Sequence, residues 1–261
     1  MLAIERRNAI LERLQIEKRV VVSELSQCYK VSEETIRRDL EKLEKEGLIV
    51  KSYGGAVLNE QTIFDLPFNV RKNQKSMEKQ QIAELVTGLV RDNEALMFDA
   101  SSTAAYIARG LKKKKSLTII TNSVEILMEL PSGSDWTVIS TGGTLHEGPF
   151  ALVGFRTNEM LAGYHVDKAI LSCTGLSLES GLADSDEQVA DSKRIMCRFA
   201  KERILVADHT KFGKEAFARI CGLDEIDKVV TDRKPPKQWL EKFKSMGIEC
   251  IYPEKEKKNK N

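Results

Sequence analysis

The feature that most constrains this sequence is a repeated alternation between short β-rich runs and helical patterns after residue 75. Seven runs rich in apolar and β-branched residues recur with helical segments between them; they are 95–99, 117–121, 136–140, 168–172, 203–207, 228–231 and 249–252. Alternation of this kind is typical of parallel strands joined by helices. We therefore predict an α/β domain with a mainly parallel sheet over residues 76–253.

The first 58 residues have a different pattern, in which short helices lead into a hairpin. Apolar residues recur at helical spacing up to about Leu14. Ser23 is the predicted N-cap of a second helix and Ser32 of a third, because a hydroxyl can accept from the free N–H groups of a first turn. The apolar stripe of the third helix is Ile36, Leu40 and Leu43, and Gly47 ends it. The runs 48–50 and 56–58 then form a hairpin, for whose turn Gly54 and Gly55 are expected to supply positive φ.

Two segments lack a regular pattern. Residues 59–75 mix polar and aromatic residues around Pro67 without a period, so we interpret them as a linker between domains 1–58 and 76–253. Residues 254–261 are charged and contain no apolar side chain, which predicts a disordered tail.

Composition excludes several classes of protein. No apolar stretch approaches the ~18 residues of a membrane span, and charges at Glu5, Arg6 and Arg7 interrupt any apolar leader. The five cysteines are scattered without a CxxC pair, so we expect reduced thiols in a cytoplasmic protein, not a disulfide framework or a zinc site. The net charge of +2 is too small to identify a polyanion partner.

The predicted third helix presents Thr35 and Arg38 outward within its first two turns, with Arg37 at the border of the apolar stripe. Three helices followed by a hairpin have the outline of a winged helix-turn-helix, whose recognition helix offers such residues to base edges and phosphates. Charge alone also allows an alternative, in which both arginines pair with Glu33, Glu34, Asp39 or Glu41 on a solvated face.

The string Thr35-Ile-Arg-Arg-Asp-Leu40 and the later Tyr53-Gly-Gly-Ala56 are specific motifs. They resemble the DNA-binding domain of the DeoR family of bacterial transcriptional regulators, in which the helix-turn-helix corresponds to about residues 20–39 and Gly-Gly-Ala belongs to the wing. One departure is Tyr53, where the family often has His. The DNA-binding residues that the resemblance implies are Ser32, Thr35, Arg37, Arg38, Lys51, Tyr53, Gly54 and Gly55.

Small polar residues follow three successive predicted strands. They are Ser101, Ser102 and Thr103 after the first, Thr121, Asn122 and Ser123 at the second, and Gly142 with Gly143 after the third. The carboxyl ends of strands in open α/β folds form the usual ligand crevice, and donors at a helix N-terminus suit a phosphate. A Ser/Thr cluster taken alone is more often explained as helix capping, but the convergence of these clusters makes a phosphorylated ligand a comparably strong interpretation.

These segments, with Asp184-Ser-Asp-Glu187 and Asp208-His-Thr-Lys-Phe-Gly213, resemble the DeoR-type sensor domain. That domain is similar in fold to sugar-phosphate isomerases and CoA transferases and typically binds a phosphorylated sugar. The effector-binding residues it implies are Asp99, Ser101, Ser102, Thr103, Thr121, Asn122, Ser123, Gly142, Gly143, Gly175, Glu187 and Lys211, the last two closing over the sugar. Ser172-Cys-Thr-Gly175 departs from the usual small-acidic-Gly pattern, which leaves the sugar open.

The resemblance implies a cytoplasmic regulator, most simply a repressor of a carbohydrate operon, that binds operator DNA as at least a homodimer and responds to a phosphorylated sugar, without cofactor or metal. The alternative is an isomerase or deaminase-like enzyme, for which Asp99, Asp184, Asp186 and Glu187 are candidate bases. Against an enzyme, His146, His165 and His209 are far apart, and neither GxxxxGK[ST] nor GxGxxG occurs.

Overall fold

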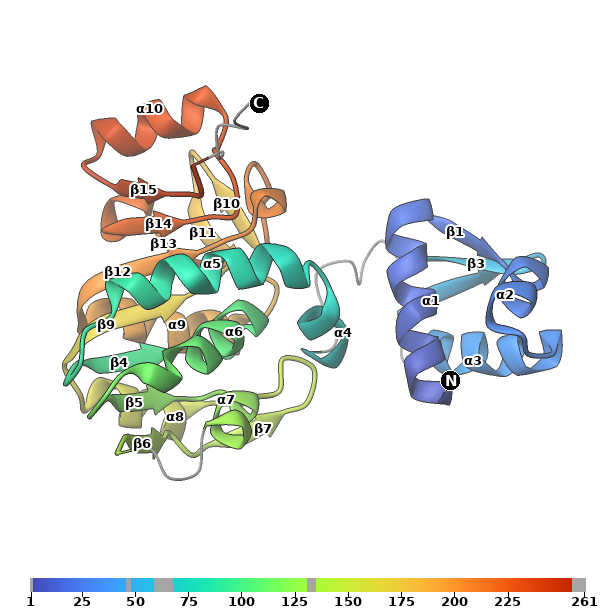
Figure 1. Ribbon diagram of the computed structural model, residues 1–261, viewed down its shortest axis with the longest axis horizontal. Helices are drawn as coiled ribbons and strands as arrows, with labels where there is room; N and C mark the ends of the chain where they lie inside the picture. The colour runs from blue at the N-terminus through green and yellow to red at the C-terminus, as the bar shows by residue number, and fades with distance from the viewer. Residues whose placement is uncertain (1, 46–47, 59–67, 131–134, 255–261) are drawn as a thin grey trace, which may run out of the picture. The chain divides into compact units, whose positions relative to one another are not determined.

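The computed structural model describes residues 2–45, 48–58, 68–130 and 135–254. The chain divides into two compact units, Met1–Gln74 and Lys75–Asn261. Figure 1 follows the elements of both units in chain order. Within the described ranges, no helix combines the length and apolar character that crossing a bilayer requires.

The first unit begins with helices that pack on a three-stranded antiparallel sheet (Figure 1). The elements are α1 (Ala3–Glu17), β1 (Arg19–Val21), α2 (Val22–Tyr29), α3 (Glu33–Lys45), β2 (Ile49–Ser52) and β3 (Gly55–Leu58). β3 pairs with β1 on one side and with β2 on the other. The stripe Ile36, Leu40 and Leu43 is buried in the core of this unit, as predicted. The arrangement is a helix-turn-helix followed by a wing.

One local prediction for this unit is wrong, and one strand was not predicted. Val20 pairs with Ala56, which makes β1 a third strand of the wing sheet. Ser23 is not the N-cap of the second helix, since α2 begins one residue earlier, directly where β1 ends at Val21. Pairing with β3 thus decides where the helix starts, and this pairing spans residues too distant to be read locally.

A short helix, α4 (Phe68–Asn73), lies inside the range that the sequence predicts as a linker. Residues 68–73 of that range are therefore helical, while residues 59–67 lie outside the described part of the chain. Val70 is 3% exposed and belongs to the core of the first unit. A helix of 6 residues is too short to show a hydrophobic period, which explains why the pattern hid it.

The second unit is built on a 7-stranded sheet with the order β15-β14-β12-β9-β4-β5-β6. Its strands are β4 (Ala95–Phe98), β5 (Thr118–Thr121), β6 (Thr137–Ser140), β9 (Val166–Leu171), β12 (Ala200–Val206), β14 (Lys228–Val230) and β15 (Glu249–Ile251). All neighbouring pairs are parallel, so the predicted fold class is confirmed. The strands consequently end together along one edge of the sheet, the carboxyl edge, and begin along the opposite amino edge.

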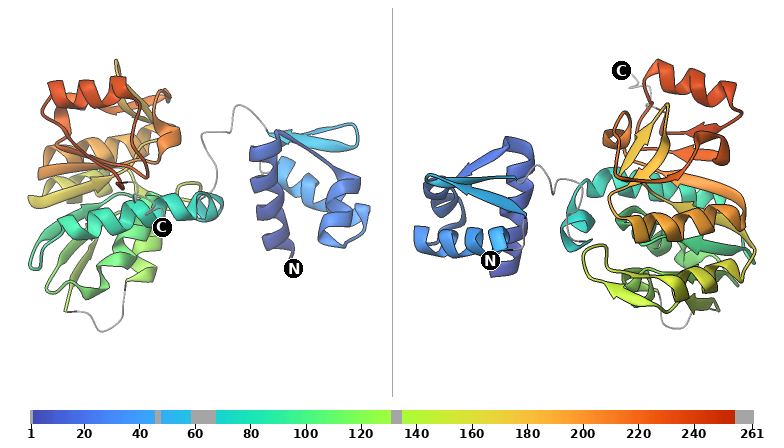
Figure 2. Two further views of the ribbon diagram at one scale, coloured as in Figure 1. Left: turned by 45° about the horizontal axis from the view of Figure 1, so that its top comes forward. Right: turned by 180° about the vertical axis from the view of Figure 1, so that it is seen from behind.

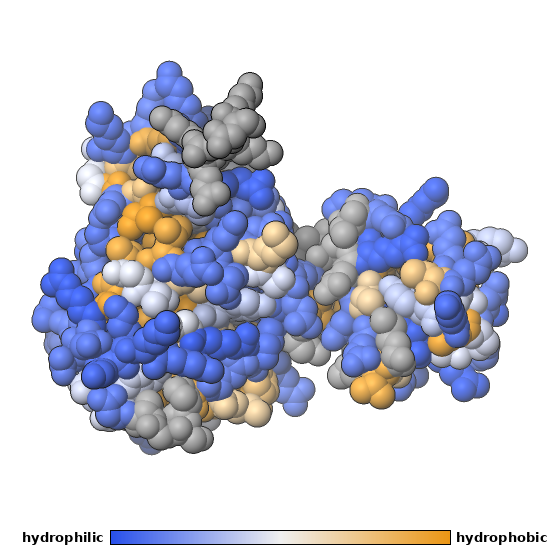
Figure 3. Space-filling model, viewed as in Figure 1, coloured by the Kyte–Doolittle hydropathy of each residue, from blue (hydrophilic) through white to orange (hydrophobic). Residues whose placement is uncertain are grey.

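Helices cover both faces of this sheet (Figures 1 and 2). α5 (Ser76–Leu89) and α6 (Ser102–Gly110) lie on one face, and α8 (Phe155–Ala162) and α9 (Glu187–Arg198) lie on the other. α7 (Val124–Glu129) follows β5, and α10 (Lys237–Ser245) precedes β15. Figure 3 shows hydrophilic residues over most of the visible face, with hydrophobic residues gathered between α5 and α10. Burial on both faces accounts for the nearly continuous apolar runs of the central strands.

Short antiparallel strands extend the unit beyond the carboxyl edge. β7 (Thr144–His146) and β8 (Ala151–Val153) form a hairpin after β6. β10 (Gly175–Ser177), β11 (Gly181–Asp184) and β13 (Ala218–Cys221) form a three-stranded sheet, of which β10 and β11 follow β9. No prediction covered these strands, because pairing with their neighbours, more than a local pattern, holds them extended.

Candidate DNA interface and candidate effector site

The candidate recognition helix α3 begins at a hydroxyl cap. The Oγ atom of Ser32 accepts a hydrogen bond from the N–H of Thr35 at 3.2 Å and lies 2.9 Å from the Thr35 Oγ1 atom. This contact satisfies one of the N–H groups that a helix start leaves without a partner. Ser32 is therefore the N-cap that the sequence predicts, and Thr35 is oriented by the same contact.

Arg37 and Arg38 are exposed on α3, and each pairs with a glutamate one turn earlier. The Arg37 Nη2 atom lies 2.7 Å from Glu33 Oε2, and the Arg38 Nε atom lies 3.4 Å from Glu34 Oε1. The pairing that the sequence left as an alternative is thus present in the protein without DNA. Exposed pairs of this spacing contribute only about 0.3–0.5 kcal/mol, so the arginines can exchange them for another anion at little cost.

Asp39 takes no part in these pairs. Its carboxylate is buried and accepts from Arg6 Nε at 2.5 Å, while Arg7 Nη1 lies 3.6 Å away. The sequence left Asp39 as a possible partner of Arg37 and Arg38, but in the structure its partners are two arginines of α1. Asp39 therefore fixes α3 against α1 and leaves the outward arginines on a supported helix.

The wing turn uses its two glycines for different reasons. Gly54 has a φ of +77°, which favours glycine. Gly55 does not have positive φ, contrary to the expectation, but a Cβ atom there would lie 2.0 Å from the Val20 carbonyl oxygen. Tyr53 is fully exposed beside this turn. The Lys51 Nζ atom lies 2.9 Å from Glu44 Oε2, a contact that joins the wing to α3.

At the carboxyl edge, the loop between β4 and α6 is organised by Asp99 and Ser101. The Ser101 Oγ atom accepts from the N–H of Ala104 at 3.1 Å and caps α6. The Asp99 carboxylate accepts from the N–H of Ser101 at 3.1 Å and from the N–H of Ser172 at 2.8 Å. Asp99 thus links the ends of β4 and β9. Ser102 and Thr103 are buried in the first turn of α6.

The end of β5 carries Thr121, Asn122 and Ser123, which are all buried. Thr121 donates to the Phe98 carbonyl at 2.8 Å, and Ser123 caps α7. The Asn122 Nδ2 atom donates to the Leu152 carbonyl at 3.0 Å, which orients the side-chain amide. The buried Oδ1 atom of Asn122 has no hydrogen-bond partner among the described residues. It is therefore an acceptor that still needs a donor.

Gly142 and Gly143 follow β6 and contact α8. The Thr157 Oγ1 atom donates to the Gly142 carbonyl at 2.7 Å. Gly143 has a φ of +113°, and a Cβ atom there would lie 2.1 Å from Thr157 Oγ1. Both observations give these glycines a structural use, which is the close approach of the loop to α8.

A buried ion cluster behind this edge was missed by the sequence analysis. The Lys193 Nζ atom, on α9, lies 2.5 Å from Asp184 Oδ2, 3.0 Å from Asp99 Oδ2 and 2.8 Å from the Ser172 carbonyl. An ammonium has three donors, so these three contacts saturate it. The sequence contains a usable signal, because Lys193 lies four residues after Val189 on the buried stripe of α9.

The charges of this cluster stabilise one another. Burial alone would raise the pKa of Asp184, but the Lys193 ammonium and the hydrogen bonds from Lys193, Thr174 and Ser185 lower it below its ordinary value. Burial likewise opposes the charge of Lys193, yet Asp184 and Asp99 raise the pKa of Lys193. The opposite charges of Asp184 and Lys193 therefore support one another in the buried cluster.

The loop after β9 carries the departure from the family pattern. Burial raises the pKa of Cys173 to about 12, although Lys211 and Lys193 act in the opposite direction. Cys173 is therefore a neutral thiol in this loop. Gly175 begins β10, and a Cβ atom there would lie 2.6 Å from the Lys214 carbonyl oxygen.

The remaining two predicted effector residues stand at separate places along the edge. Glu187 is exposed at the start of α9, directly after the N-cap Asp186. Lys211 is half-buried in a short 3-10 turn, His209–Lys211, that follows β12. Among the described residues, neither side chain forms an ion pair. Two histidines that lie far apart in the sequence contact carboxylates here. The His146 Nε2 atom lies 3.0 Å from Asp186 Oδ2, and the His209 Nδ1 atom lies 2.9 Å from Asp232 Oδ2.

Comparison with known proteins decides the family. Residues 6–62 match the model of the DeoR-like helix-turn-helix domain, and residues 74–233 match that of the DeoR C terminal sensor domain. The chain belongs to the DeoR family. The HTH-type transcriptional regulator YulB of Bacillus subtilis (strain 168) is 39% identical over 89% of this chain and 90% of its own. The glycerol-3-phosphate regulon repressor of Escherichia coli (strain K12) is 30% identical over 89% and 92%.

Membership of this family makes the chain a DNA-binding transcriptional regulator, and the enzyme alternative is set aside. Among solved structures, ribose 5-phosphate isomerase A from Methanocaldococcus jannaschii aligns with a TM-score of 0.38 and 20% identity, over 52% of this chain and 54% of that one.

Proposed function

We propose that this DeoR-family protein represses a carbohydrate catabolic operon and that a phosphorylated sugar, bound at the carboxyl edge, changes its affinity for operator DNA. The effector proposal rests on one observation: hydrogen-bond donors follow one strand, and an acceptor without a donor follows the neighbouring strand. Ser101, Ser102 and Thr103 place hydroxyl and N–H donors at the start of α6, while Asn122 holds an acceptor without a donor. A phosphate needs donors and a sugar hydroxyl can donate, so one sugar phosphate suits both.

Other residues of the edge complete the proposed site. Lys211 supplies a mobile positive charge for the phosphate, and Glu187 closes over the sugar from the start of α9. The remaining proposed contacts are Asp99, Thr121, Ser123, Gly142, Gly143 and Gly175. The Escherichia coli relative, a glycerol-3-phosphate regulon repressor, supports a phosphorylated effector of this class.

The proposed DNA surface comprises the start of α3 and the wing. Its residues are Ser32, Thr35, Arg37, Arg38, Lys51, Tyr53, Gly54 and Gly55. A helix-turn-helix protein commonly reads two half-sites with two copies of the motif, so we expect at least a homodimer. A full switch from 1:99 to 99:1 in DNA-competent population requires a roughly 10⁴-fold preference of the effector for one conformation.

The test combines a thermal-shift panel with DNA retardation. Phosphorylated sugars that bind the folded protein should raise its melting temperature, while the unphosphorylated sugars should not. The same compounds should change retention of promoter fragments by wild-type protein. Ser102→Ala should lose the effector response and keep DNA binding, whereas the matched control Ser245→Ala, on α10, should keep both. A panel without any shift, or a fully responsive Ser102→Ala variant, contradicts the proposed effector site.

A further inference from the structure

The start of the recognition helix carries as many exposed carboxylates as exposed guanidinium groups. Glu33, Glu34, Arg37 and Arg38 all lie in its first two turns, and each has roughly half or more of its side chain exposed. The two glutamates and two arginines cancel in charge. The part of the protein expected to approach DNA most closely is therefore not a positive surface.

This balance is unfavourable for binding to DNA in general. Phosphates attract cations irrespective of sequence, so a carboxylate at the interface lowers affinity for every duplex. Exposed ion pairs contribute little to the stability of a fold. A favourable interaction of carboxylates with the helix N-terminus offers one structural reason for Glu33 and Glu34. It does not require two glutamates that each hold an arginine.

Docking changes the partners of all four side chains. When Arg37 and Arg38 turn to guanine or to a phosphate, Glu33 and Glu34 lose the guanidinium groups that they now contact. A carboxylate is acceptor-only, so in the major groove it needs a donor from a base. The donors there are the N4 amino group of cytosine and the N6 amino group of adenine, while guanine and thymine present oxygen acceptors.

We propose that Glu33 and Glu34 are specificity-determining residues of α3, which select cytosine or adenine beside a guanine read by Arg37 or Arg38. On a matching duplex the broken pairs are replaced by contacts from both partners to bases. On any other duplex the carboxylates are left against acceptors or phosphates, which weakens binding. The proposal rests on the proposed role of α3 as the helix that enters the major groove.

The experiment uses the full chain and a DNA duplex obtained by in vitro selection. Wild-type protein is used to select sequences from a randomised duplex library, and the recovered duplex is compared with a scrambled duplex of equal length and composition. Affinities are measured at one salt concentration for Glu33→Ala, Glu34→Ala and the control Glu41→Ala. Glu41 is exposed further along α3, so its substitution makes the same charge change away from the helix start.

All three substitutions should tighten binding to the scrambled duplex to a similar extent, since each removes one negative charge. The ratio of affinities for selected and scrambled duplex should fall about tenfold for Glu33→Ala or Glu34→Ala and stay unchanged for Glu41→Ala, because alanine has no group that can accept from a base. Selection repeated with each of the first two variants should lose the cytosine or adenine preference at one position. Loss of a helix-end interaction alone would not move a base preference, and thermal unfolding checks that every variant folds.

Two results overturn the proposal in distinguishable ways. If the alanine variants at 33 and 34 keep the affinity ratio and recover the wild-type sequence, the two glutamates do not read bases, although α3 can still do so. If wild-type protein recovers no sequence from the library, the reading role of α3 fails as well.

Discussion

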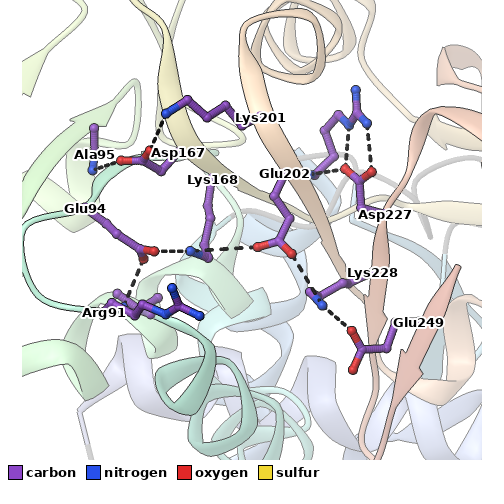
Figure 4. Close-up of polar contacts among 12 residues, drawn as sticks. Arg91, Glu94, Ala95, Asp167, Lys168, Lys201, Glu202, Asp227, Lys228 and Glu249 are labelled. Atoms are coloured by element: carbon purple, nitrogen blue, oxygen red, sulfur yellow. Dashed lines mark hydrogen bonds and ion pairs between the residues drawn. The ribbon is translucent and has the colours of Figure 1, made fainter.

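Charged side chains find partners in different ways at the two edges of the seven-stranded sheet. At the amino edge, charges alternate in a row across the sheet, as Figure 4 shows for Glu94, Lys168, Glu202, Lys228 and Glu249. The Lys168 and Lys228 ammonium groups lie 3.8 Å and 3.4 Å from Glu202, and each also contacts a second glutamate. Every charge in this row has an opposite neighbour, so the row serves the sheet.

At the carboxyl edge, the buried charges are paired with one another, while nearby polar groups keep unused hydrogen-bonding atoms. Lys193 is saturated by Asp99, Asp184 and Ser172, but Asn122 keeps a buried oxygen without a donor. Lys211 forms no ion pair among the described residues. Among the described residues of the two edges, the polar groups without partners thus lie at the carboxyl edge, where the effector site is proposed.

The largest expected effect comes from removing the cation of the buried cluster. Lys193→Met should lower the free energy of unfolding by about 3–5 kcal/mol, because it leaves two carboxylates buried without their counter-ion. Denaturant unfolding measures the loss. Lys168→Met at the amino edge is the matched variant and should cost less, since Glu202 keeps Lys228 at 3.4 Å. Equal losses at the two edges would remove the distinction between them.

Acid should act next most strongly, again through the carboxyl edge. The folded pKa of Asp184 is lowered from 3.8, so its contribution to stability is complete above that value and is lost as pH falls through the folded pKa. Denaturant unfolding between pH ~5 and ~2 should show this decline. Asp184→Asn should flatten that part of the profile. An unchanged slope in that variant would show that other carboxylates dominate acid unfolding.

Substitution of the α6 cap separates stability from ligand binding. Ser101→Ala should lower the free energy of unfolding by about 1 kcal/mol, because the N–H of Ala104 loses its acceptor. Ser102→Ala should change stability less, since Ser102 does not cap the helix. Calorimetry with a sugar phosphate should show weaker binding for both variants. If only the cap variant binds more weakly, the hydroxyls serve the helix and not a ligand.

The smallest effect is expected from an ion pair at the amino edge. Arg203 donates to both oxygens of Asp227, at 2.8 Å from Nε and 2.9 Å from Nη2, and both side chains are partly exposed. Arg203→Ala should therefore lower the free energy of unfolding by only about 0.2–1 kcal/mol. Added salt should shrink the difference from wild type. A loss comparable to that of Lys193→Met would contradict the comparison.

The seven strands of the main sheet were predictable, and the short strands beyond its carboxyl edge were not. The central strands follow from their apolar runs, because a strand buried on both faces needs apolar residues throughout. β7, β8, β10, β11 and β13 are fixed by pairing with one another, so no local pattern announces them. The start of α2 was misjudged for the same reason, since the pairing of Val20 with Ala56 holds the chain extended until Val21.

The proposed sites show the same division. Residues that follow strands or cap helices, such as Ser32 and Ser101, carry their role in the local sequence. The partners of Asp39 and Asp99 are tens of residues away, on α1 and on α9. Motifs alone cannot choose between Arg6 and Arg38 as the partner of Asp39, because only the packing of α3 on α1 decides it.

By itself, the sequence determined that this chain joins a helix-turn-helix to a parallel α/β domain, because hydrophobic periodicity and family motifs are local properties that survive without contacts. Only the tertiary structure decided that Lys193 is buried between two carboxylates, that Asn122 retains an unpartnered oxygen, and that Glu33 and Glu34 hold the outward arginines. These facts depend on distances between side chains, and folding sets those distances by satisfying many polar groups at once.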